Sequence, residues 1–164
     1  MTDIRSLILA SGSRTRREML ASAGITFEVV PAFVDEAAVR EVLLADGADG
    51  DPADVAEVLA RAKAEAVSAL HPHALVIGGD QVLACEGRQF EKPADVEAAH
   101  QQLAQLRGKT HQLHSAVVLA AAGETVWSHV GSADLTMRDF SPRFLADYLA
   151  QAGARVTDSV GAYQ

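Results

Sequence analysis

Cysteine is almost absent from this chain of 164 residues, which contains a single one, Cys85. One thiol cannot form an internal disulfide, and the sequence has no group of cysteines and histidines with the spacing of a metal site. Because Cys85 lies in an apolar stretch, a buried and inert thiol is expected there rather than a nucleophile. A disulfide-stabilised secreted domain and a Cys/His metal centre are therefore not expected.

Basic residues are also scarce, since 14 Lys and Arg stand against 22 Asp and Glu and give a formal net charge of −8. Binding to a nucleic-acid backbone requires an extended basic surface, so nucleic acid is not expected as a partner. The sequence has no signal peptide, no lipidation motif and no apolar run long enough to span a membrane. We therefore expect a cytoplasmic protein that does not bind a membrane.

Hydrophobic residues make up 49% of the chain, which is enough to bury the core of one domain of ordinary size. Apolar periodicity and turn residues predict, in order, a strand at 6–10, a helix at 15–23, a strand at 26–30, a helix at 53–70, a strand at 74–79 running into 80–84, a helix at 94–106, strands at 111–121 and 125–137, and a helix from Ser141 to about Ala152. This order predicts an α/β fold, a mixed sheet flanked by helices, as a single domain over residues 1–164. Because the chain ends after a glycine-rich turn, a C-terminal segment is expected to be missing.

A turn of serines and glycine follows the first apolar strand. Ser11 or Ser13 can cap the next helix, and Gly12 allows a ligand to approach the backbone closely. The unpaired N–H groups at the start of a helix bind phosphate and other anions. The segment therefore has the order of elements with which α/β proteins bind phosphate.

Three arginines, Arg14, Arg16 and Arg17, lie in the first turns of this helix. Cations are unfavourable there, because the helix macrodipole is positive at its N-terminus. A bound polyanion would remove the conflict, and guanidinium groups are suited to paired contacts with phosphate oxygens. One interpretation is thus that the arginines converge on a phosphate group, and the alternative is a surface helix with a solvated basic edge.

Asp80 is the most informative acidic residue, since it follows Gly78 and Gly79 at the end of an apolar strand. A carboxylate in such a place is costly unless it faces a site, so Asp80 is a candidate proton acceptor or metal ligand. A turn aspartate bonded to its own backbone is an equal alternative. Asp35 and Glu36 could supply a second carboxylate for a hard cation such as Mg²⁺, or could form a solvated loop.

Two lysines and two histidines complete the candidates. Lys63 lies on the long predicted helix, and Lys92 is restricted to an extended conformation by Pro93. Each lysine could bind a phosphate or simply face solvent. His111 and His114 could equally lie on the exposed face of a predicted strand. Taken together, the arginine-rich turn, the strand-end acid and the lysines favour a phosphate-binding site.

The chain resembles the Maf-type nucleoside triphosphate pyrophosphatases over essentially all of its 164 residues. Seven blocks in the order of that family carry the resemblance: Leu9-Ala10-Ser11-Gly12-Ser13 with Arg16-Arg17, Val34-Asp35-Glu36, Leu59-Ala60-Arg61-Ala62-Lys63-Ala64, Gly79-Asp80-Gln81-Val82, Lys92-Pro93, Leu106 with Gly108-Lys109-Thr110-His111, and Gly161-Ala162-Tyr163. The resemblance implies an elongated, two-lobed, ITPase-like α/β fold with a central cleft, commonly as a homodimer. It also implies hydrolysis of an NTP or dNTP to the monophosphate and pyrophosphate, with Mg²⁺ or Mn²⁺ as cofactor.

The resemblance further implies roles for individual residues. Asp80 would accept the proton of the attacking water and, together with Glu36, would hold the metal ion. The substrate-binding residues that it implies are Ser11, Ser13, Thr15, Arg16, Arg17, Lys63, Gln81 and Lys92. The chemistry agrees with these roles, because phosphoryl transfer depends on charge neutralisation and an oriented water more than on covalent catalysis.

The base of the substrate stays open. Gln81 and the arginine pair resemble the family members that act on 7-methyl-GTP, whereas Gly161-Ala162-Tyr163 is closer to the members that act on dTTP and UTP. Thr15 stands where these subgroups carry an arginine or an aromatic residue. The implied role is the removal of non-canonical or modified nucleotides, and the alternative is a nucleotide-binding regulator of septum formation and cell division without turnover.

Overall fold

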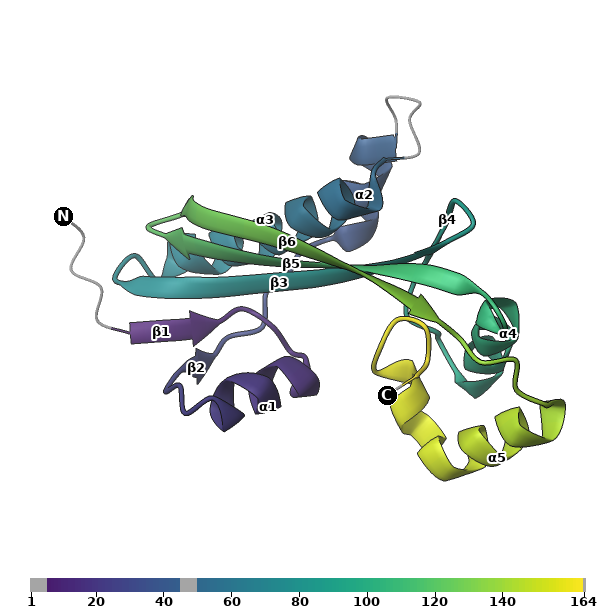
Figure 1. The fold of residues 1–164 in the computed structure, drawn as a ribbon. Helices are drawn as coiled ribbons and strands as arrows, with labels where there is room; N and C mark the ends of the chain where they lie inside the picture. Colours follow the sequence, from purple (N-terminus) through teal and green to yellow (C-terminus); the bar gives the residue numbers. More distant parts are fainter. Residues whose placement is uncertain (1–5, 45–49, 164) are drawn as a thin grey trace. The chain divides into compact units, whose positions relative to one another are not determined.

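The computed structural model describes residues 6–44 and 50–163, in which strands and helices are interspersed (Figure 1). The elements in chain order are β1 (Ser6–Leu9), α1 (Arg14–Ser22), β2 (Glu28–Val29), α2 (Glu36–Leu44), α3 (Pro52–Leu70), β3 (Ala74–Cys85), β4 (Arg88–Phe90), α4 (Val96–Leu106), β5 (Thr110–Ala121), β6 (Glu124–Thr136), α5 (Pro142–Ala152) and the 3₁₀ helix η1 (Gly153–Thr157). None of the helices in these described ranges is long and apolar enough to pass through a membrane.

The strands form one mixed sheet in the order β2-β1-β3-β5-β6, and β4 pairs with β3 beside this row. Strand β1 is parallel to both neighbours, with Ile8 opposite Glu28 of β2 and opposite Val76 of β3. Strands β3 and β4 are antiparallel, with Leu83 opposite Phe90. A two-residue turn joins β5 to β6, which is the connection of an antiparallel hairpin. The predicted α/β fold with a mixed sheet flanked by helices is confirmed.

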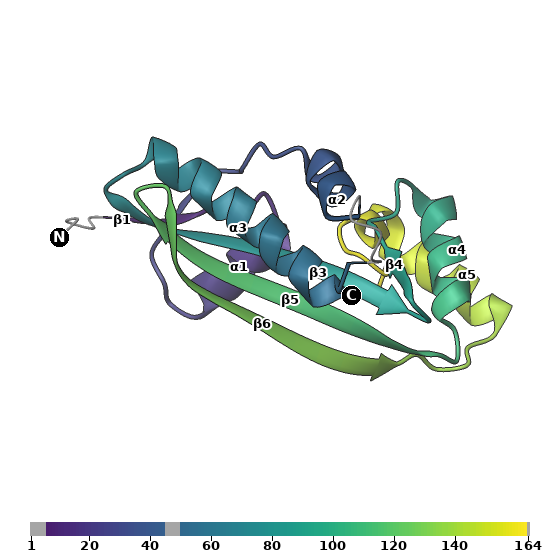
Figure 2. The same ribbon diagram turned by 90° about the horizontal axis from the view of Figure 1, so that it is seen from above.

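The chain divides into two compact units, and β3, β5 and β6 contribute residues to both. The first unit consists of Met1–Asp80 and Ser115–Gly131, and the second of Gln81–His114 and Ser132–Gln164. In the first unit α3 and α1 cover opposite faces of the sheet, as Figures 1 and 2 show together. Buried side chains of this unit include Ile8, Ala10, Val67, Ala74 and Val76, and those of the second include Leu83, Leu106, Leu103, Leu145 and Val156.

Helix α3 approaches β3 closely at Gly78, which is why the first unit has a glycine in the middle of a buried strand. A Cβ atom at this position would lie 2.7 Å from the Cβ of Ala64 and closer still to the carbonyl oxygen of Ala60. Alanines at these two helix positions and a glycine on the strand therefore let the two backbones pack directly. This contact holds α3, and with it Lys63, against the strand that carries Asp80.

Two helix starts lie where the sequence places them. Helix α3 begins at Pro52, and the side chain of Asp51 accepts a hydrogen bond from the backbone N–H of Ala53 at 2.9 Å. Helix α5 begins at Pro142, and Ser141 caps it. Proline has no N–H to leave unpaired in the first turn, and short polar side chains satisfy the N–H groups that remain. These two signals made both boundaries predictable.

Five elements differ from the predictions, and two of them, β4 and η1, have no counterpart among the predicted elements. Helix α2 was not predicted, although Asp35 marks its start by accepting a hydrogen bond from the N–H of Ala38 at 3.0 Å. The strand predicted at 26–30 is reduced to two residues, which pair with β1. The runs at 74–79 and 80–84 form one continuous strand, β3, so Asp80 lies within a strand and not in a turn.

Candidate active site

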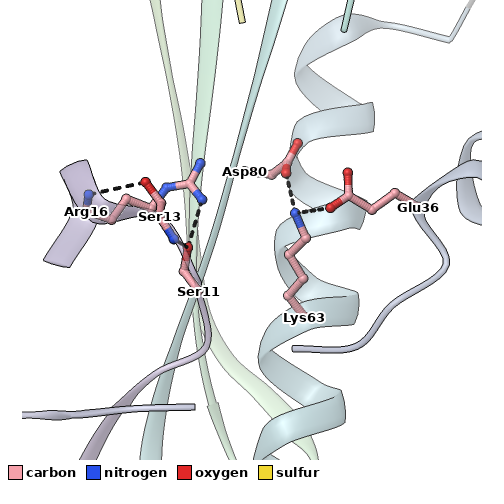
Figure 3. A network of polar contacts seen from close by, with 6 residues as sticks. All are labelled: Ser11, Ser13, Arg16, Glu36, Lys63 and Asp80. Atoms are coloured by element: carbon pink, nitrogen blue, oxygen red, sulfur yellow. Dashed lines mark hydrogen bonds and ion pairs between the residues drawn. The ribbon is translucent and has the colours of Figure 1, made fainter. Parts of the chain in front are cut away.

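The turn after β1 is held together by its own hydroxyl groups. The Oγ atom of Ser13 accepts a hydrogen bond from the N–H of Arg16 at 3.4 Å and caps α1. The Oγ atom of Ser11 accepts from the N–H of Ser13 and from Nη1 of Arg16, each at 3.2 Å (Figure 3). Between the serines Gly12 is exposed, and a Cβ atom added there would have no neighbour within 4 Å. The turn is therefore fixed in conformation and open beside its glycine.

The three arginines of α1 have different surroundings. Arg16 is half-buried and its guanidinium contacts the turn; burial lowers its pKa, while the nearby carboxylates of Asp80 and Glu36 raise it. Arg14 is exposed and its Nε lies 2.7 Å from Oε1 of Glu18, one helical turn further on. Arg17 is exposed as well. Of the three, Arg16 is thus the arginine that the structure holds at the serine turn.

Asp80, Lys63 and Glu36 form a cluster in the same unit, opposite the serine turn (Figure 3). The Nζ atom of Lys63 on α3 lies 2.6 Å from Oδ1 of Asp80 and 2.8 Å from Oε1 of Glu36. Exposed fractions of the side chains are 12% for Lys63, 8% for Asp80 and 48% for Glu36. The ammonium group therefore lies between two carboxylates in a largely desolvated position.

The second oxygen of Asp80, Oδ2, is buried and has no hydrogen-bond partner among the described residues. A buried carboxylate oxygen without a partner is costly, and such atoms in native structures call for an explanation. Figure 3 shows the guanidinium of Arg16 and the carboxylate of Asp80 on facing sides of the cluster. An incoming water molecule or cation between them would satisfy this oxygen, so the arrangement can take a proton or hold a metal ion there.

The four ionic groups of Arg16, Lys63, Asp80 and Glu36 balance one another in formal charge. A triphosphate brings several negative charges, so its binding requires additional positive charge. The described residues contain no group of three or more His, Cys, Asp or Glu arranged to hold a metal ion. Mg²⁺ is commonly held by one or two carboxylates together with substrate phosphates and waters. Glu36 and Asp80, with the unpartnered Oδ2, fit a cation of this kind.

The remaining predicted substrate-binding residues are described individually. Thr15 is exposed in the first turn of α1. Gln81 follows Asp80 in β3 and is half-buried, and Lys92 is exposed in the segment after β4; both belong to the second unit. The serine turn and the cluster that faces it thus bring together these residues of the predicted set in the first unit: Ser11, Ser13, Arg16, Lys63, Glu36 and Asp80.

His111 and His114 are buried and not on an exposed strand face. Nε2 of His111 lies 2.8 Å from the hydroxyl oxygen of Tyr163, and Nδ1 of His114 lies 2.8 Å from Oγ of Ser132, all within the second unit. Burial lowers the pKa of His111 and raises that of Tyr163. The sequence offered no signal for these pairings, because the partners lie far apart along the chain.

Sequence reasoning found Glu36 but missed the helix that positions it. Asp35, the other half of the acidic pair, caps α2, and this leaves Glu36 as the first helical residue with its carboxylate on Lys63. The available signal was a capping aspartate ahead of a run of helix formers. The ion pair itself joins residues 27 positions apart and had no sequence signature.

Comparison with known proteins adds to this geometry. The sequence model of the family described as "Maf-like protein" matches residues 6–164. The chain is 55% identical over 157 residues to a nucleoside triphosphate pyrophosphatase of Paramagnetospirillum magneticum, covering 96% of this chain and 80% of the relative. It is 51% identical over 158 residues to a 7-methyl-GTP pyrophosphatase of Mesorhizobium japonicum, covering 96% and 78%. A nucleoside triphosphate pyrophosphatase of Granulibacter bethesdensis is 47% identical, with 96% and 79% covered.

Proposed function

Since this chain belongs to the Maf family, we propose that it is a nucleoside triphosphate pyrophosphatase whose active site is the cluster around Asp80. The substrate is an NTP or dNTP, and the products are the nucleoside monophosphate and pyrophosphate. One observation carries the placement of the site: the carboxylate of Asp80 lies near the cationic side chains of Lys63 and Arg16, yet its Oδ2 is buried and has no partner among the described residues. Names of relatives in the same family support the reaction.

The proposed chemistry is a direct displacement by water. The water oxygen bonds to the α-phosphorus, the bond from that phosphorus to the oxygen bridging the α- and β-phosphates breaks, and pyrophosphate leaves with the bridging oxygen and the electron pair. Asp80 accepts the proton of the water, as expected for a general base within reach of the reacting atoms. Ser11, Ser13, Arg16 and Lys63 offer hydroxyl and cationic groups to the phosphate oxygens. Arg17 and Lys92 are proposed to add positive charge to the same substrate.

Glu36 and Asp80 are the residues that would hold a divalent cation, with Mg²⁺ and Mn²⁺ as the candidates. When bound, such an ion supplies charge neutralisation and makes a nearby water easier to deprotonate. Carboxylates in general are modest bases at neutral pH, so this help is needed. Both carboxylates lie within ion-pair distance of the Lys63 ammonium, so they are close enough together to share a cation.

For the base we propose a 7-methyl-GTP-type or dTTP/UTP-type substrate, with Thr15 and Gln81 among the residues in contact with it. One named relative is a 7-methyl-GTP pyrophosphatase at 51% identity, which supports the first of these. The proposed role is house-cleaning, the removal of modified or non-canonical nucleotides. On the family resemblance we also propose a homodimer that works in the cytoplasm.

Asp80→Asn tests the proposal. Loss of the proton acceptor is expected to lower kcat by at least about a hundredfold, while nucleotide binding changes little because the amide is nearly isosteric. Pyrophosphate release with Mg²⁺ or Mn²⁺ across canonical and methylated triphosphates measures the first effect, and calorimetric titration with a non-hydrolysable analogue measures the second. Asp134→Asn, at an exposed position of β6, is the control and is expected to retain full activity.

Two outcomes would contradict the proposal. Equal pyrophosphate release by Asp80→Asn and the unaltered protein would remove Asp80 from the mechanism. Tight nucleotide binding without release from any member of the panel would instead favour a nucleotide-binding regulator of septum formation and cell division.

A further inference from the structure

We propose that Lys63 is a built-in competitor of the divalent cation, occupying the position between Asp80 and Glu36 until a polyphosphate draws it away. The cation then binds tightly only together with the polyphosphate. This inference rests on the proposed function, because it assumes that a phosphate-bearing substrate binds at the cluster. It assigns Lys63 a second role as a positioning residue that controls when the metal site forms.

The position of the ammonium group is the first argument. Its Nζ atom lies 2.6 Å from Oδ1 of Asp80 and 2.8 Å from Oε1 of Glu36, which are the two carboxylates available to a hard cation. An ammonium within hydrogen-bond distance of both oxygens occupies the space that a metal ion would share between them. Repulsion between like charges at this distance is strong where side chains are as little exposed as those of Lys63 and Asp80. Lys63 and a divalent cation therefore compete for the same two oxygens.

The unpartnered oxygen of Asp80 is the second argument. Lys63 satisfies Oδ1 and leaves Oδ2 buried without a partner among the described residues. The ammonium is thus an incomplete partner for this carboxylate, and a divalent cation that takes its place could gain the oxygen that Lys63 does not reach. A site designed only as a structural ion pair would satisfy both oxygens, as buried ion pairs are stable only when their remaining lone pairs are bonded.

The flexibility of lysine, compared with its neighbour Arg16, is the third argument. Lysine is a point charge on a flexible four-carbon stem with three rotatable donors, so it can turn from carboxylate to phosphate without a change in backbone. Arg16 is fixed by its bond to Ser11 and remains with the serine turn. A triphosphate offers Lys63 more negative charge than the two carboxylates do. When the Lys63 ammonium moves to the phosphate, Asp80 and Glu36 become free to bind the cation. Linkage requires that the bound cation in turn favours polyphosphate binding.

Binding of Mn²⁺ alone, followed by electron paramagnetic resonance of the free ion, tests this inference without any turnover. Lys63→Gln removes the competing charge and is expected to bind Mn²⁺ at least about tenfold more tightly than the unaltered protein in the absence of nucleotide. Lys63→Arg keeps a cation between the carboxylates and is expected to bind Mn²⁺ as weakly as the unaltered protein. Combining Lys63→Gln with Asp80→Asn is expected to abolish the gain, which locates the site.

Lys109→Gln is the matched control. Lys109 also forms an ion pair with a carboxylate, 2.6 Å from Oε2 of Glu86, but it lies in the second unit and 42% of its side chain is exposed. Its substitution is expected to leave Mn²⁺ binding unchanged. An equal gain in Lys109→Gln and Lys63→Gln would overturn the inference, because it would show a general effect of net charge.

Unchanged or weaker Mn²⁺ binding by Lys63→Gln would also overturn the inference that Lys63 competes with the cation. If this variant is unfolded without metal, refolding on addition of Mn²⁺ supports the inference, and failure to refold at any Mn²⁺ concentration contradicts it. Failure of the proposed function is distinguished by the separate pyrophosphate assay. Turnover by the unaltered protein with no gain in Lys63→Gln defeats the inference alone, whereas a gain in Lys63→Gln without any turnover defeats the function alone.

Discussion

Gly12 is a glycine whose lack of a side chain the packing of the described residues does not explain. Its φ is not in the left-handed region, and a Cβ atom there would meet nothing within 4 Å. By contrast, Gly78 lets two backbones pack against each other, and Gly161 has a φ of 84° with Leu83 and Tyr163 close by. A residue that the fold does not require, placed between two serines of the candidate site, points to close approach of a ligand to the backbone.

Gly12→Ala is therefore expected to separate binding from stability. The free energy of unfolding should stay within about 0.5 kcal/mol of the original value, since the methyl group has room and φ lies outside the left-handed region. The KM for the triphosphate should rise about tenfold, as expected when a hydrogen bond to a charged oxygen is lost. Denaturant titration and steady-state kinetics on the same preparation measure both. A loss of stability with an unchanged KM would instead show that Gly12 is required for the fold and not for ligand binding.

Arg16 and Arg17 provide a second comparison of neighbouring side chains. Arg16→Ala removes the guanidinium that contacts Ser11 and faces Asp80, so nucleotide affinity should fall about ten- to a hundredfold. Arg17 is exposed, where charge interactions are screened, and Arg17→Ala should cost less than about fivefold. Calorimetric titration with a non-hydrolysable triphosphate measures the two losses. Equal losses would show that Arg17 contributes as much to binding as Arg16.

Packing of α3 against β3 determines whether Lys63 reaches Asp80. Gly78→Ala would push a methyl group into the backbone of α3 at Ala60, and backbone atoms cannot give way as a flexible side chain can. The expected cost is about 1–3 kcal/mol, the usual range for overpacking. Gly131→Ala in β6 is the control, because its nearest neighbour would be Nε2 of His129 at 3.9 Å. Urea titrations of the two variants measure the difference, and equal stability would contradict the close packing.

The elements that could be predicted from sequence are those with local signals. Pro52 and Pro142 marked helix starts, and the apolar run from Ala74 marked a buried strand. Helix α2 was missed because its acidic start was interpreted as a site or a solvated loop. The strand at 26–30 was overestimated because, of these five residues, Glu28 and Val29 alone pair with β1 in the described part of the chain. Pairing partners are set by tertiary contacts and leave no local trace.

In the candidate site, too, residues could be predicted from local signals but their contacts with distant residues could not. Asp80 could be found because a carboxylate next to an apolar strand is costly without a purpose. The contact between Lys63 and Asp80 joins residues 17 positions apart, and the contact between His111 and Tyr163 joins residues 52 apart. The resemblance placed both pairs in ordered blocks of sequence. Their mutual positions follow from the packing of α3 on β3 and of the C-terminal turn on β5, which sequence order does not determine.

Spectroscopic reporters divide between the two units of the chain. The sequence has one tryptophan and two tyrosines: Trp127 belongs to the first unit, and Tyr148 and Tyr163 to the second. Tyrosine absorbance therefore follows the second unit, where the hydroxyl of Tyr148 donates to the carbonyl oxygen of Ala162 and that of Tyr163 contacts His111. Tryptophan fluorescence follows the first unit, which holds the candidate site.

Acidification is expected to destabilise the chain through His111. Burial disfavours the charged imidazole, so the pKa of His111 is lower in the folded protein than in the unfolded chain. The unfolded chain thus takes up a proton first, and the free energy of unfolding falls as the pH drops below about 6.5. Urea midpoints from tyrosine absorbance should therefore be lower at pH 5.5 than at pH 7.5.

His111→Gln should reduce this pH dependence, because glutamine can still hydrogen-bond to Tyr163 but does not titrate. Comparing the two pH values within each protein cancels any change in basal stability that the substitution causes. His73→Gln, at an exposed position of the first unit, should keep the pH dependence of the unaltered protein. If His111→Gln retained the full difference between the two midpoints, another titrating group would have to explain the loss of stability in acid.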